Sequence, residues 1–275
     1  MRRLVSALIV VVLLGIVGGL AICAIPRIRD AADRAQCQNN LKQIGMALQN
    51  SYSTYGTFLP ATIPNKDLSC GKRLSWLVEA MPFIEQNRIF SSLDREKGWQ
   101  DNPNLIPKVP NVDANDHVIG PPIPVGELKI FRCPADPTAS PPNTASLTNY
   151  VGISGVGADA AELPLEYPGV GFFGCERQIK LEDIKDGTAN TIAVMETNSN
   201  LGPWTAGGFP TVRPFDSAMA PYLGAGRPFG SGHRAGTQAV FADGSVHNLT
   251  PSTHPEVLEA LATIAGGEQT EPLGD

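Results

Sequence analysis

The sequence predicts an α+β protein in which a long N-terminal transmembrane helix continues into an outer domain with an antiparallel β-sheet and a loop-rich insertion. Three observations predict this fold: residues 4–25 carry no charge, an apolar repeat of helical period follows Pro26, and short β-prone runs near the C-terminus flank an Asp-Gly pair. Of the 275 residues, 24 are proline and 28 are glycine, and most of these follow residue 97. Turns and irregular connections should therefore make up much of the outer domain.

The uncharged segment 4–25 (LVSALIVVVLLGIVGGLAICAI) has the length of a membrane-spanning helix. It would extend about 33 Å as a helix, against roughly 30 Å of hydrocarbon in a bilayer. Arg2 and Arg3 precede it, and aspartates offset the arginines that follow it, so the positive-inside rule places the N-terminus in the cytoplasm. We expect residues 1–25 to anchor the chain in the lipid bilayer by a single pass, and residues 26–275 to form a periplasmic or extracytoplasmic domain.

Two kinds of cleaved leader are alternatives to a permanent anchor. A secretory signal has an apolar region of about 7–15 residues before a small-residue cleavage site, whereas this apolar segment is longer and leads into a helical pattern. A lipoprotein signal has a small residue before its cysteine, whereas Ile22 precedes Cys23 here. The uncleaved anchor is therefore the favoured interpretation.

Helical periodicity predicts three helical regions outside the membrane. Apolar residues at spacings of three and four favour a helix over residues 27–56, continuous with the anchor. Residues 74–94 form a second region, interrupted at Pro82, and an amphipathic stretch at residues 255–264 predicts a C-terminal helix ended by glycines. The body between them, residues 57–250, is expected to be a loop-rich mixture of strands and turns.

A β-hairpin is predicted where Asp243 and Gly244 separate residues 237–242 (TQAVFA) from residues 245–249 (SVHNL), because Asp-Gly favours a two-residue type I′ turn. In the register of that turn, one apolar face is formed by Ala239, Phe241 and Val246. Other short strands are predicted at residues 128–132, 150–153 and 191–195.

The hairpin decides whether His233 and Asp243, in the stretch GHRAGTQAVFADGSVHNL, can form a catalytic pair. Six strand residues of about 3.3 Å each separate the two residues by roughly 20 Å, whereas a His-Asp pair requires about 3 Å. We therefore expect structural roles, with His233 just before the strand and Asp243 in the turn with Gly244. Asp186 and Gly187 form a second turn of the same kind.

Other patterns exclude more chemistry than they indicate. The net charge is −6, and no cluster of Lys and Arg is interleaved with aromatic residues, so nucleic acid is not an expected partner. Residues 169–174 match G-x-G-x-x-G but lack the preceding strand and the following helix of a dinucleotide site. Residues 182–187 resemble the start of a calcium loop, but Ile184 stands where an oxygen ligand is required.

Neither cysteine nor histidine spacing indicates a metal site. No two cysteines form Cys-x-x-Cys, and the histidines lack ligand spacing, although His247 and His254 could approach His233. No metal, cofactor or catalytic residue is therefore expected. Cys23 lies in the apolar segment, which leaves four cysteines in a compartment that permits disulfides, with three possible pairings among Cys37, Cys70, Cys133 and Cys175.

Several stretches are specific in combination and in order. They are residues 37–45 (CQNNLKQIG), 55–58 (YGTF), 75–76 (SW), 81–86 (MPFIEQ), 131–136 (FRCPAD), 149–152 (NYVG), 186–192 (DGTANTI), 232–246 and 266–268 (GGE). Together they resemble the prepilin-type bacterial proteins with the H-x9-D-G processing-associated domain, also called domain of unknown function 1559.

This resemblance implies a pilin-like outer domain behind a long hydrophobic helix, similar to type IV pilins and to the pseudopilins of type II secretion, and location in the bacterial inner membrane. It also implies a disulfide pairing. Cys37 and Cys133 both fall in matching motifs and are the first expected pair, which leaves Cys70 and Cys175 as the second.

The N-terminus departs from the prepilin pattern Gly-Phe-Thr-Leu-x-Glu, where processing occurs. Here Arg3 is followed directly by the apolar segment, with neither the glycine nor a glutamate. In pilins that glutamate pairs with the N-terminal amine of a neighbouring subunit, and an unpaired charge in lipid is costly. The departure argues against assembly into a processed fibre and favours a plain membrane-anchored envelope protein.

The expected function is therefore non-enzymatic: a pseudopilin-like envelope protein with a structural or protein-interaction role, linked to type II secretion or type IV pilus-like systems. Its expected partners are copies of itself or other envelope proteins. One alternative is a binding module for an envelope glycan or peptide, based on aromatic residues expected to be exposed, namely Trp99, Trp204 and Tyr222. The other alternative is a hydrolase or a metal-dependent enzyme that uses His233 with distant acidic partners such as Glu196.

Overall fold

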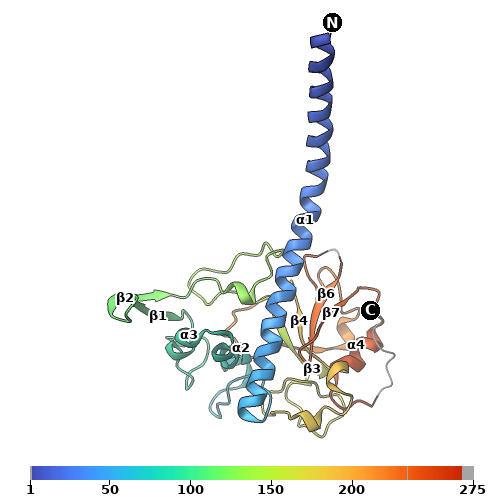
Figure 1. Ribbon diagram of the computed structural model, residues 1–275. Helices are drawn as coiled ribbons and strands as arrows, with labels where there is room; N and C mark the ends of the chain where they lie inside the picture. Colours follow the sequence, from blue (N-terminus) through green and yellow to red (C-terminus); the bar gives the residue numbers. More distant parts are fainter. Residues whose placement is uncertain (1, 234, 268–275) are drawn as a thin grey trace.

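The computed structural model describes residues 2–233 and 235–267, and for residues 2–24 it describes the backbone alone. Its longest element is α1 (Arg2–Tyr55), one helix that continues through Pro26. The N-terminal half of α1 projects away from the body, whereas the C-terminal half lies against it (Figure 1). The predicted α+β class and the long N-terminal helix are confirmed.

The predicted anchor falls almost entirely on residues whose side chains lie outside the described part of the chain. Within the described part, no helix combines the length and the apolar character that crossing a membrane requires. Ile25 and Ile28, near the start of the described side chains, are well exposed. The transmembrane segment stays a prediction from the sequence.

The C-terminal half of α1 packs on the body because its apolar residues recur on one face. Leu41, Ile44 and Leu48, at spacings of three and four, are all buried. They belong to the same core cluster as Val194 and Val240 of the central sheet. Each such buried side chain stabilises the fold by about 1.5–3 kcal/mol, so this half of α1 is an integral part of the domain core.

Five strands form the central sheet: β3 (Tyr150–Val156), β4 (Ile192–Glu196), β5 (Val212–Phe215), β6 (Thr237–Phe241) and β7 (Val246–Leu249). The strand order is β5-β3-β4-β6-β7. All neighbouring strands pair antiparallel except β3 and β5, which pair parallel. The predicted antiparallel sheet is therefore confirmed, with one parallel pairing at its edge.

The second face of the sheet is covered by α4 (Pro255–Ala262), at the position predicted for a C-terminal helix. Leu258 and Leu261 of α4 pack with Val151 and Ile153 of β3 in a second core cluster. The central strands β4 and β6 therefore lie between α1 and α4, and every residue of both strands is buried. This burial on both faces agrees with the apolar runs at residues 192–195 and 239–241.

The region predicted as helical at residues 74–94 consists of shorter pieces. α2 (Trp76–Ala80) leads into a 3₁₀ turn over Met81–Ile84, and α3 (Asn87–Ser92) follows. Pro82 lies in the 3₁₀ turn and has no amide hydrogen with which to continue an α-helix. The interruption is therefore located where the proline predicts it.

The strand predicted at residues 128–132 is wrong, because Lys129–Phe131 is a 3₁₀ turn. The Asn40 side chain of α1 donates hydrogen bonds to the backbone oxygens of Lys129 (3.0 Å) and Arg132 (2.9 Å). These bonds use carbonyl groups that a sheet would need for pairing. Contact with α1 therefore overrides the local strand signal.

An arm that the sequence does not predict extends from the body (Figure 1). It consists of β1 (Lys108–Val112) and β2 (Val118–Pro124), which pair antiparallel and apart from the central sheet. Val118 and Ile119 of the arm are 75% and 64% exposed, and a cavity of about 600 Å³ lies between the arm and α3. β2 contains three prolines. Because proline is found in sheets mainly in edge strands, these prolines argue against a strand when the sequence is considered alone.

The predicted hairpin is present, but its pairing differs from the prediction by one residue. Val240 pairs with Val246, so Ala242, Asp243 and Gly244 form a three-residue loop in place of a two-residue turn. Gly244 has a φ of 86°, the left-handed conformation that closes a loop of this kind.

This change of register moves a side chain to the other face of the sheet. Val246 packs against the cluster beneath α1, whereas Ala239 and Phe241 belong to the cluster beneath α4. The single apolar face predicted for these three residues is therefore wrong. Gly244 can adopt the positive φ of this three-residue loop as well as that of a type I′ turn, and the Gln49 side chain of α1 donates a hydrogen bond to the carbonyl of Ala242 in the loop.

Candidate functional site

Two disulfides join distant parts of the chain. Cys37 of α1 is bonded to Cys133, 96 residues later, with the two Cα atoms 5.3 Å apart. Cys70 is bonded to Cys175, with a Cα–Cα distance of 5.8 Å. Both distances are usual for disulfides. Of the three possible pairings, the structure therefore has the one that the resemblance implies.

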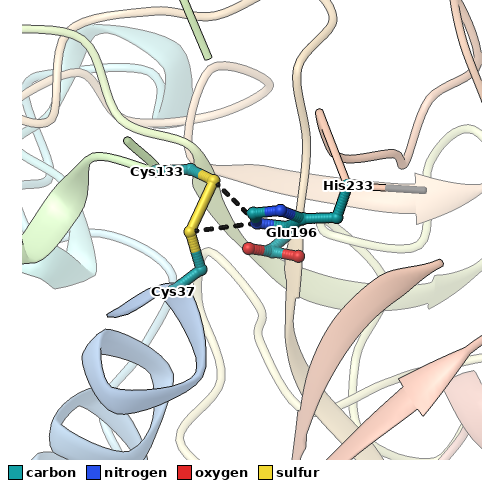
Figure 2. Close-up of side chains that lie close together, drawn as sticks. All are labelled: Cys37, Cys133, Glu196 and His233. Atoms are coloured by element: carbon teal, nitrogen blue, oxygen red, sulfur yellow. Dashed lines mark hydrogen bonds between the residues drawn. A yellow bond between two sulfur atoms is a disulfide. The ribbon is translucent and has the colours of Figure 1, made fainter. Parts of the chain in front are cut away.

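His233 faces the first of these disulfides (Figure 2). Its Nε2 lies 3.2 Å from the Sγ of Cys133 and 3.2 Å from the Sγ of Cys37. On the other side of the ring, Nδ1 lies 3.8 Å from Oδ1 of Asp30, two turns before Cys37 on α1. The His233 side chain is fully buried, and this burial lowers the pKa of the imidazole, although the charges of Asp30 and Asp33 oppose the shift. The ring is therefore uncharged at neutral pH.

A tight loop before β6 positions His233. The Ser231 hydroxyl accepts a hydrogen bond from the His233 N–H (3.2 Å) and donates one to the Gly236 carbonyl (2.6 Å). Gly232 approaches the segment after Cys133 so closely that a Cβ would lie 2.6 Å from the carbonyl oxygen of Ala135. Only glycine permits this approach, so Gly232 brings the neighbouring histidine to the disulfide.

Glu196 is the fourth member of the site and the last residue of β4. Strand alternation places it on the same face as Val194, the face that α1 covers. Its Oε2 accepts a hydrogen bond from the backbone N–H of Gln238 at 2.9 Å, whereas its Oε1 has no hydrogen-bond partner among the described residues. Burial raises the pKa of Glu196 to about 8, although the bond from Gln238 opposes the shift. The carboxyl group is therefore mostly protonated at neutral pH.

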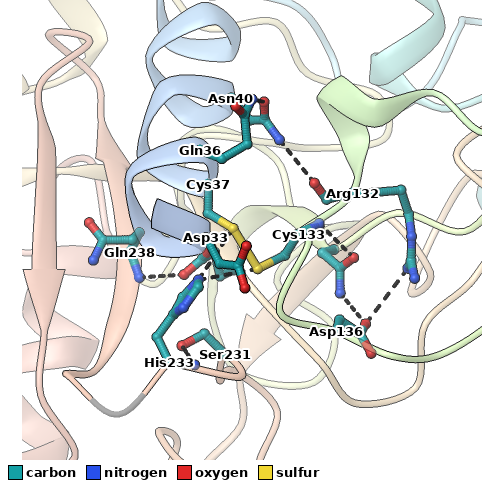
Figure 3. Close-up of a disulfide and its surroundings, with 12 residues drawn as sticks. Asp33, Gln36, Cys37, Asn40, Arg132, Cys133, Asp136, Ser231, His233 and Gln238 are labelled. Carbon is teal, nitrogen blue, oxygen red and sulfur yellow. Dashed lines mark hydrogen bonds and ion pairs between the residues drawn. A yellow bond between two sulfur atoms is a disulfide. The ribbon is translucent and has the colours of Figure 1, made fainter. Parts of the chain in front are cut away.

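Polar residues of the family-like motifs surround the disulfide (Figure 3). Asn149 accepts a hydrogen bond from the Cys133 N–H (3.0 Å) and donates one to the Thr197 carbonyl (2.9 Å). It also donates to the carboxylate of Asp136. Together with Asn40, which holds the segment before Cys133, these bonds fix the disulfide relative to the end of β4.

The four donor side chains of the site lie within one small volume. The nearest donor atoms of Cys37, Cys133, Glu196 and His233 are all within 4.8 Å of one another, and all four residues are buried. While the disulfide is closed, this arrangement joins α1 to the loops that precede β3 and β6. Two sulfurs, an imidazole nitrogen and a carboxyl oxygen are also a set of ligands suited to a transition metal.

The structure places Asp243 and Gly244 outside this site, in the loop at the other end of β6 from His233. Oδ1 of Asp243 accepts a hydrogen bond from the Ser245 N–H at 2.8 Å, and the Gly244 N–H donates to the Phe241 carbonyl at 2.8 Å. Asp243 therefore contacts its own loop and not the imidazole.

His247 and His254 do not approach His233, although the sequence allowed it. His247 is exposed on β7, with Nε2 3.0 Å from the Ser245 hydroxyl. His254 immediately precedes α4, and its Nδ1 lies 3.7 Å from Oε2 of Glu256. The pairing of β7 with β6 and the position of α4 on the far face of the sheet keep both imidazoles away from the disulfide.

Asp186 and Gly187 form a second structural contact. The Asp186 carboxylate accepts hydrogen bonds from the N–H groups of Gly266 (2.8 Å) and Gly267 (3.0 Å). Gly187, with a φ of 92°, begins the turn that leads to β4. Two family-like motifs that are far apart in sequence are therefore in contact here. The Asp186 carboxylate accepts hydrogen bonds from the backbone that follows α4.

We expect Asp186→Asn to lower the free energy of unfolding by about 1–3 kcal/mol, because it weakens three hydrogen bonds to a charged acceptor, from the N–H groups of Gly266 and Gly267 and from the Thr263 hydroxyl. Urea denaturation followed by tryptophan fluorescence measures the change. Glu182→Gln is the matched control, since the Glu182 side chain is exposed in the same turn and its replacement should cost less than about 0.5 kcal/mol. Equal losses for the two variants would contradict this role of Asp186.

Sequence reasoning named His233 and both cysteines but did not place Glu196 beside them. Glu196 entered only as a distant acidic partner of His233. One local signal was present: a glutamate ends the otherwise apolar strand IAVME, and acidic residues are rarely fully buried. A glutamate at the end of an apolar strand indicates that its position is unusual, but the local sequence does not indicate which residues surround it.

Comparison with protein-family models matches residues 26–220 of the chain to the family described as protein of unknown function (DUF1559). No curated protein and no solved structure matches the chain.

Proposed function

Because the chain belongs to the DUF1559 family of proteins of unknown function, with a match over residues 26–220, we propose its function from the arrangement of its own residues. In this proposal, the protein is a non-enzymatic, pseudopilin-like component of the bacterial envelope. It is anchored in the inner membrane by a single pass through residues 4–25, with a cytoplasmic N-terminus and a periplasmic or extracytoplasmic domain. Its role is structural or in protein interaction, within a type II secretion or type IV pilus-like system.

The observation that carries this proposal is the arrangement of α1. The uncharged segment 4–25 belongs to the half of α1 that projects from the body (Figure 1). The other half supplies core residues and is joined to the body by the Cys37–Cys133 disulfide. This arrangement supports a role for α1 as a stem: its N-terminal half would lie in the membrane, and its C-terminal half would hold the folded domain outside it.

The interaction role is supported by the arm formed by β1 and β2. Val118, Ile119 and Ile123 of this arm are largely exposed, although large apolar side chains gathered on a surface usually mark a contact. The glycan- or peptide-binding alternative has less support, because Trp204 and Tyr222 are 0% and 1% exposed. The expectation that these two aromatic residues are exposed is therefore wrong.

The hydrolase alternative also has less support from the geometry. The structure does bring His233 and Glu196 together. However, both side chains are buried beneath α1, and the imidazole faces a disulfide in place of a nucleophile. A substrate could reach them only after the surrounding structure rearranged.

The anchor is tested with the full chain carrying a C-terminal tag. It should stay in the membrane pellet after extraction with alkaline carbonate, and its tag should be cleaved by protease in spheroplasts with the membrane intact. A variant in which a cleavable secretory signal replaces residues 1–25 should release the domain in soluble form. Extraction of the full chain by carbonate would overturn the proposal.

Processing is tested by intact mass and N-terminal sequencing of the protein from its membrane fraction. A start at Met1 or Arg2 supports a permanent anchor, and a cut near Leu4 with a methylated amine would show pilin-type processing instead. The interaction role is tested by a photoreactive amino acid at position 119, with the exposed position 182 as control. The photoreactive residue at position 119 should form a cross-link with another envelope protein or with a second copy of the chain, whereas the same residue at position 182 should form none.

A further inference from the structure

Two buried polar side chains, those of His233 and Glu196, lie beside the Cys37–Cys133 disulfide, although a structural disulfide needs neither of them. A buried carboxyl oxygen without a partner is costly, and most buried polar groups have one. Oε1 of Glu196 has no partner within the described residues, and Glu196 is 1% exposed. It lies beside two sulfurs and an imidazole nitrogen (Figure 2).

The positions of these donor atoms are close to those of a tetrahedral zinc site. With zinc–sulfur bonds of about 2.3 Å and zinc–nitrogen or zinc–oxygen bonds of about 2.0–2.2 Å, neighbouring ligand atoms are roughly 3.3–3.8 Å apart. Nε2 of His233 already lies 3.2 Å from each sulfur. The two sulfurs, bonded to each other in the disulfide, are the atoms that would have to separate.

Two of these donor side chains have a group behind them where metal ligands usually have one. Metal-binding histidines usually direct their second ring nitrogen toward a carboxylate or carbonyl group, and Nδ1 of His233 faces Asp30 at 3.8 Å. The Gln238 N–H holds one oxygen of Glu196 and leaves the other directed into the cluster. These two contacts are independent of the disulfide.

We propose that reduction of the Cys37–Cys133 disulfide converts this cluster into a zinc site, with the two cysteine sulfurs, His233 Nε2 and Glu196 Oε1 as ligands. A dithiol reductant supplies two electrons and two protons and itself becomes a disulfide, so that only the S–S bond of the protein breaks. As zinc binds, the two thiols formed and the Glu196 carboxyl group release their protons to solvent, because the ligands bind zinc as thiolates and a carboxylate. The proposal does not depend on the function proposed above.

Local spacing in the sequence gives no sign of this site, because the ligands come from four separate segments. Cys37 is on α1, Cys133 follows a 3₁₀ turn, Glu196 ends β4 and His233 precedes β6. The fold alone brings them together.

The test uses the full chain in detergent, reduced without oxygen by a water-soluble phosphine, which takes an oxygen atom from water and becomes a phosphine oxide. After the phosphine is removed, cobalt(II) is titrated as the probe. The reduced protein should bind one equivalent, with the visible bands of tetrahedral cobalt and a thiolate-to-cobalt charge-transfer band, and zinc should displace it. The oxidised protein should show neither band.

Reduction also opens the second disulfide, so cobalt could bind to the thiols of Cys70 and Cys175. Variants distinguish binding at the proposed site from binding there. Glu196→Gln should weaken cobalt binding by more than about 100-fold, whereas Asp30→Asn, which removes only the carboxylate behind His233, should weaken it by about 10-fold. His233→Asn removes a ligand and should act like Glu196→Gln, while His247→Asn, on the exposed face of β7, should bind as the wild type does.

Circular dichroism shows which variants fold, and either ligand variant with a native spectrum is sufficient for the test. Two results would overturn the proposal. One is a reduced wild-type protein without the tetrahedral thiolate spectrum. The other is a folded Glu196→Gln or His233→Asn variant that binds cobalt as tightly as the wild type, which would assign the binding to Cys70 and Cys175.

Discussion

Replacement of both Cys37 and Cys133 by serine should lower the free energy of unfolding by about 4–5 kcal/mol, since the chain-entropy cost of closing a loop of this length is of that size. The two cysteines are 96 residues apart. Urea denaturation of the full chain in detergent, followed by the fluorescence of the buried Trp76 and Trp204, measures the loss.

The second disulfide provides the matched control. Cys70 and Cys175 are 105 residues apart, so loop closure alone predicts nearly the same loss when both become serine. A larger loss at Cys37 and Cys133 is expected, because that pair also covers His233 and Glu196. If the Cys37→Ser and Cys133→Ser double variant unfolded at the wild-type urea concentration, the disulfide would not stabilise the fold.

Raising the pH from about 4.5 to 8 should destabilise the oxidised protein through Glu196, by an amount on the order of a few kcal/mol. The pKa of Glu196 is about 8 in the folded chain, against a usual value of 4.5. Between these pH values the folded state holds a proton that the unfolded state has released. The contribution to stability is therefore complete below pH 4.5 and is lost as the pH rises through 8.

Glu196→Gln isolates this contribution, because glutamine has nearly the same shape, still accepts the bond from Gln238 and does not titrate. The variant should be more stable than the wild type at pH 8, and its stability should vary less over the same range. Glu162→Gln, at an exposed position, should follow the wild-type pH dependence. Parallel pH profiles for the wild type and Glu196→Gln would show that Glu196 is not the group responsible.

Local sequence signals predicted the elements whose residues determine their own conformation. The Asp243-Gly244 pair located the hairpin and Pro82 located the helix break, because in each case a backbone preference acts within a few residues. The register of the hairpin was missed because the Asp-Gly pair suits a three-residue loop as well as a two-residue turn, and the contact of that loop with Gln49 of α1 leaves no local signal. The turn at Lys129–Phe131 was missed because its contact with α1 is not local: Asn40 binds the carbonyl of Lys129 and that of Arg132, the residue after the turn.

The candidate site was predicted only in parts. The family-like motifs indicated His233, Cys37 and Cys133, but the contact between His233 and Cys37 spans 196 residues. Such a contact depends on how α1 and the sheet pack, which no local pattern contains. Glu196 was the least predictable member, because its role arises from the face of β4 on which it lies.

The continuity of α1 also determines how the outer domain is oriented. In the proposed topology the membrane segment ends near Ile25, and Cys37 lies about 18 Å farther along the helix axis. α1 passes through Pro26 as one helix, and its C-terminal half is part of the core, so the membrane segment and the domain are connected by continuous helix. In that topology, a tilt or rotation of the helix in the bilayer would change the height and the direction of the β1–β2 arm above the membrane.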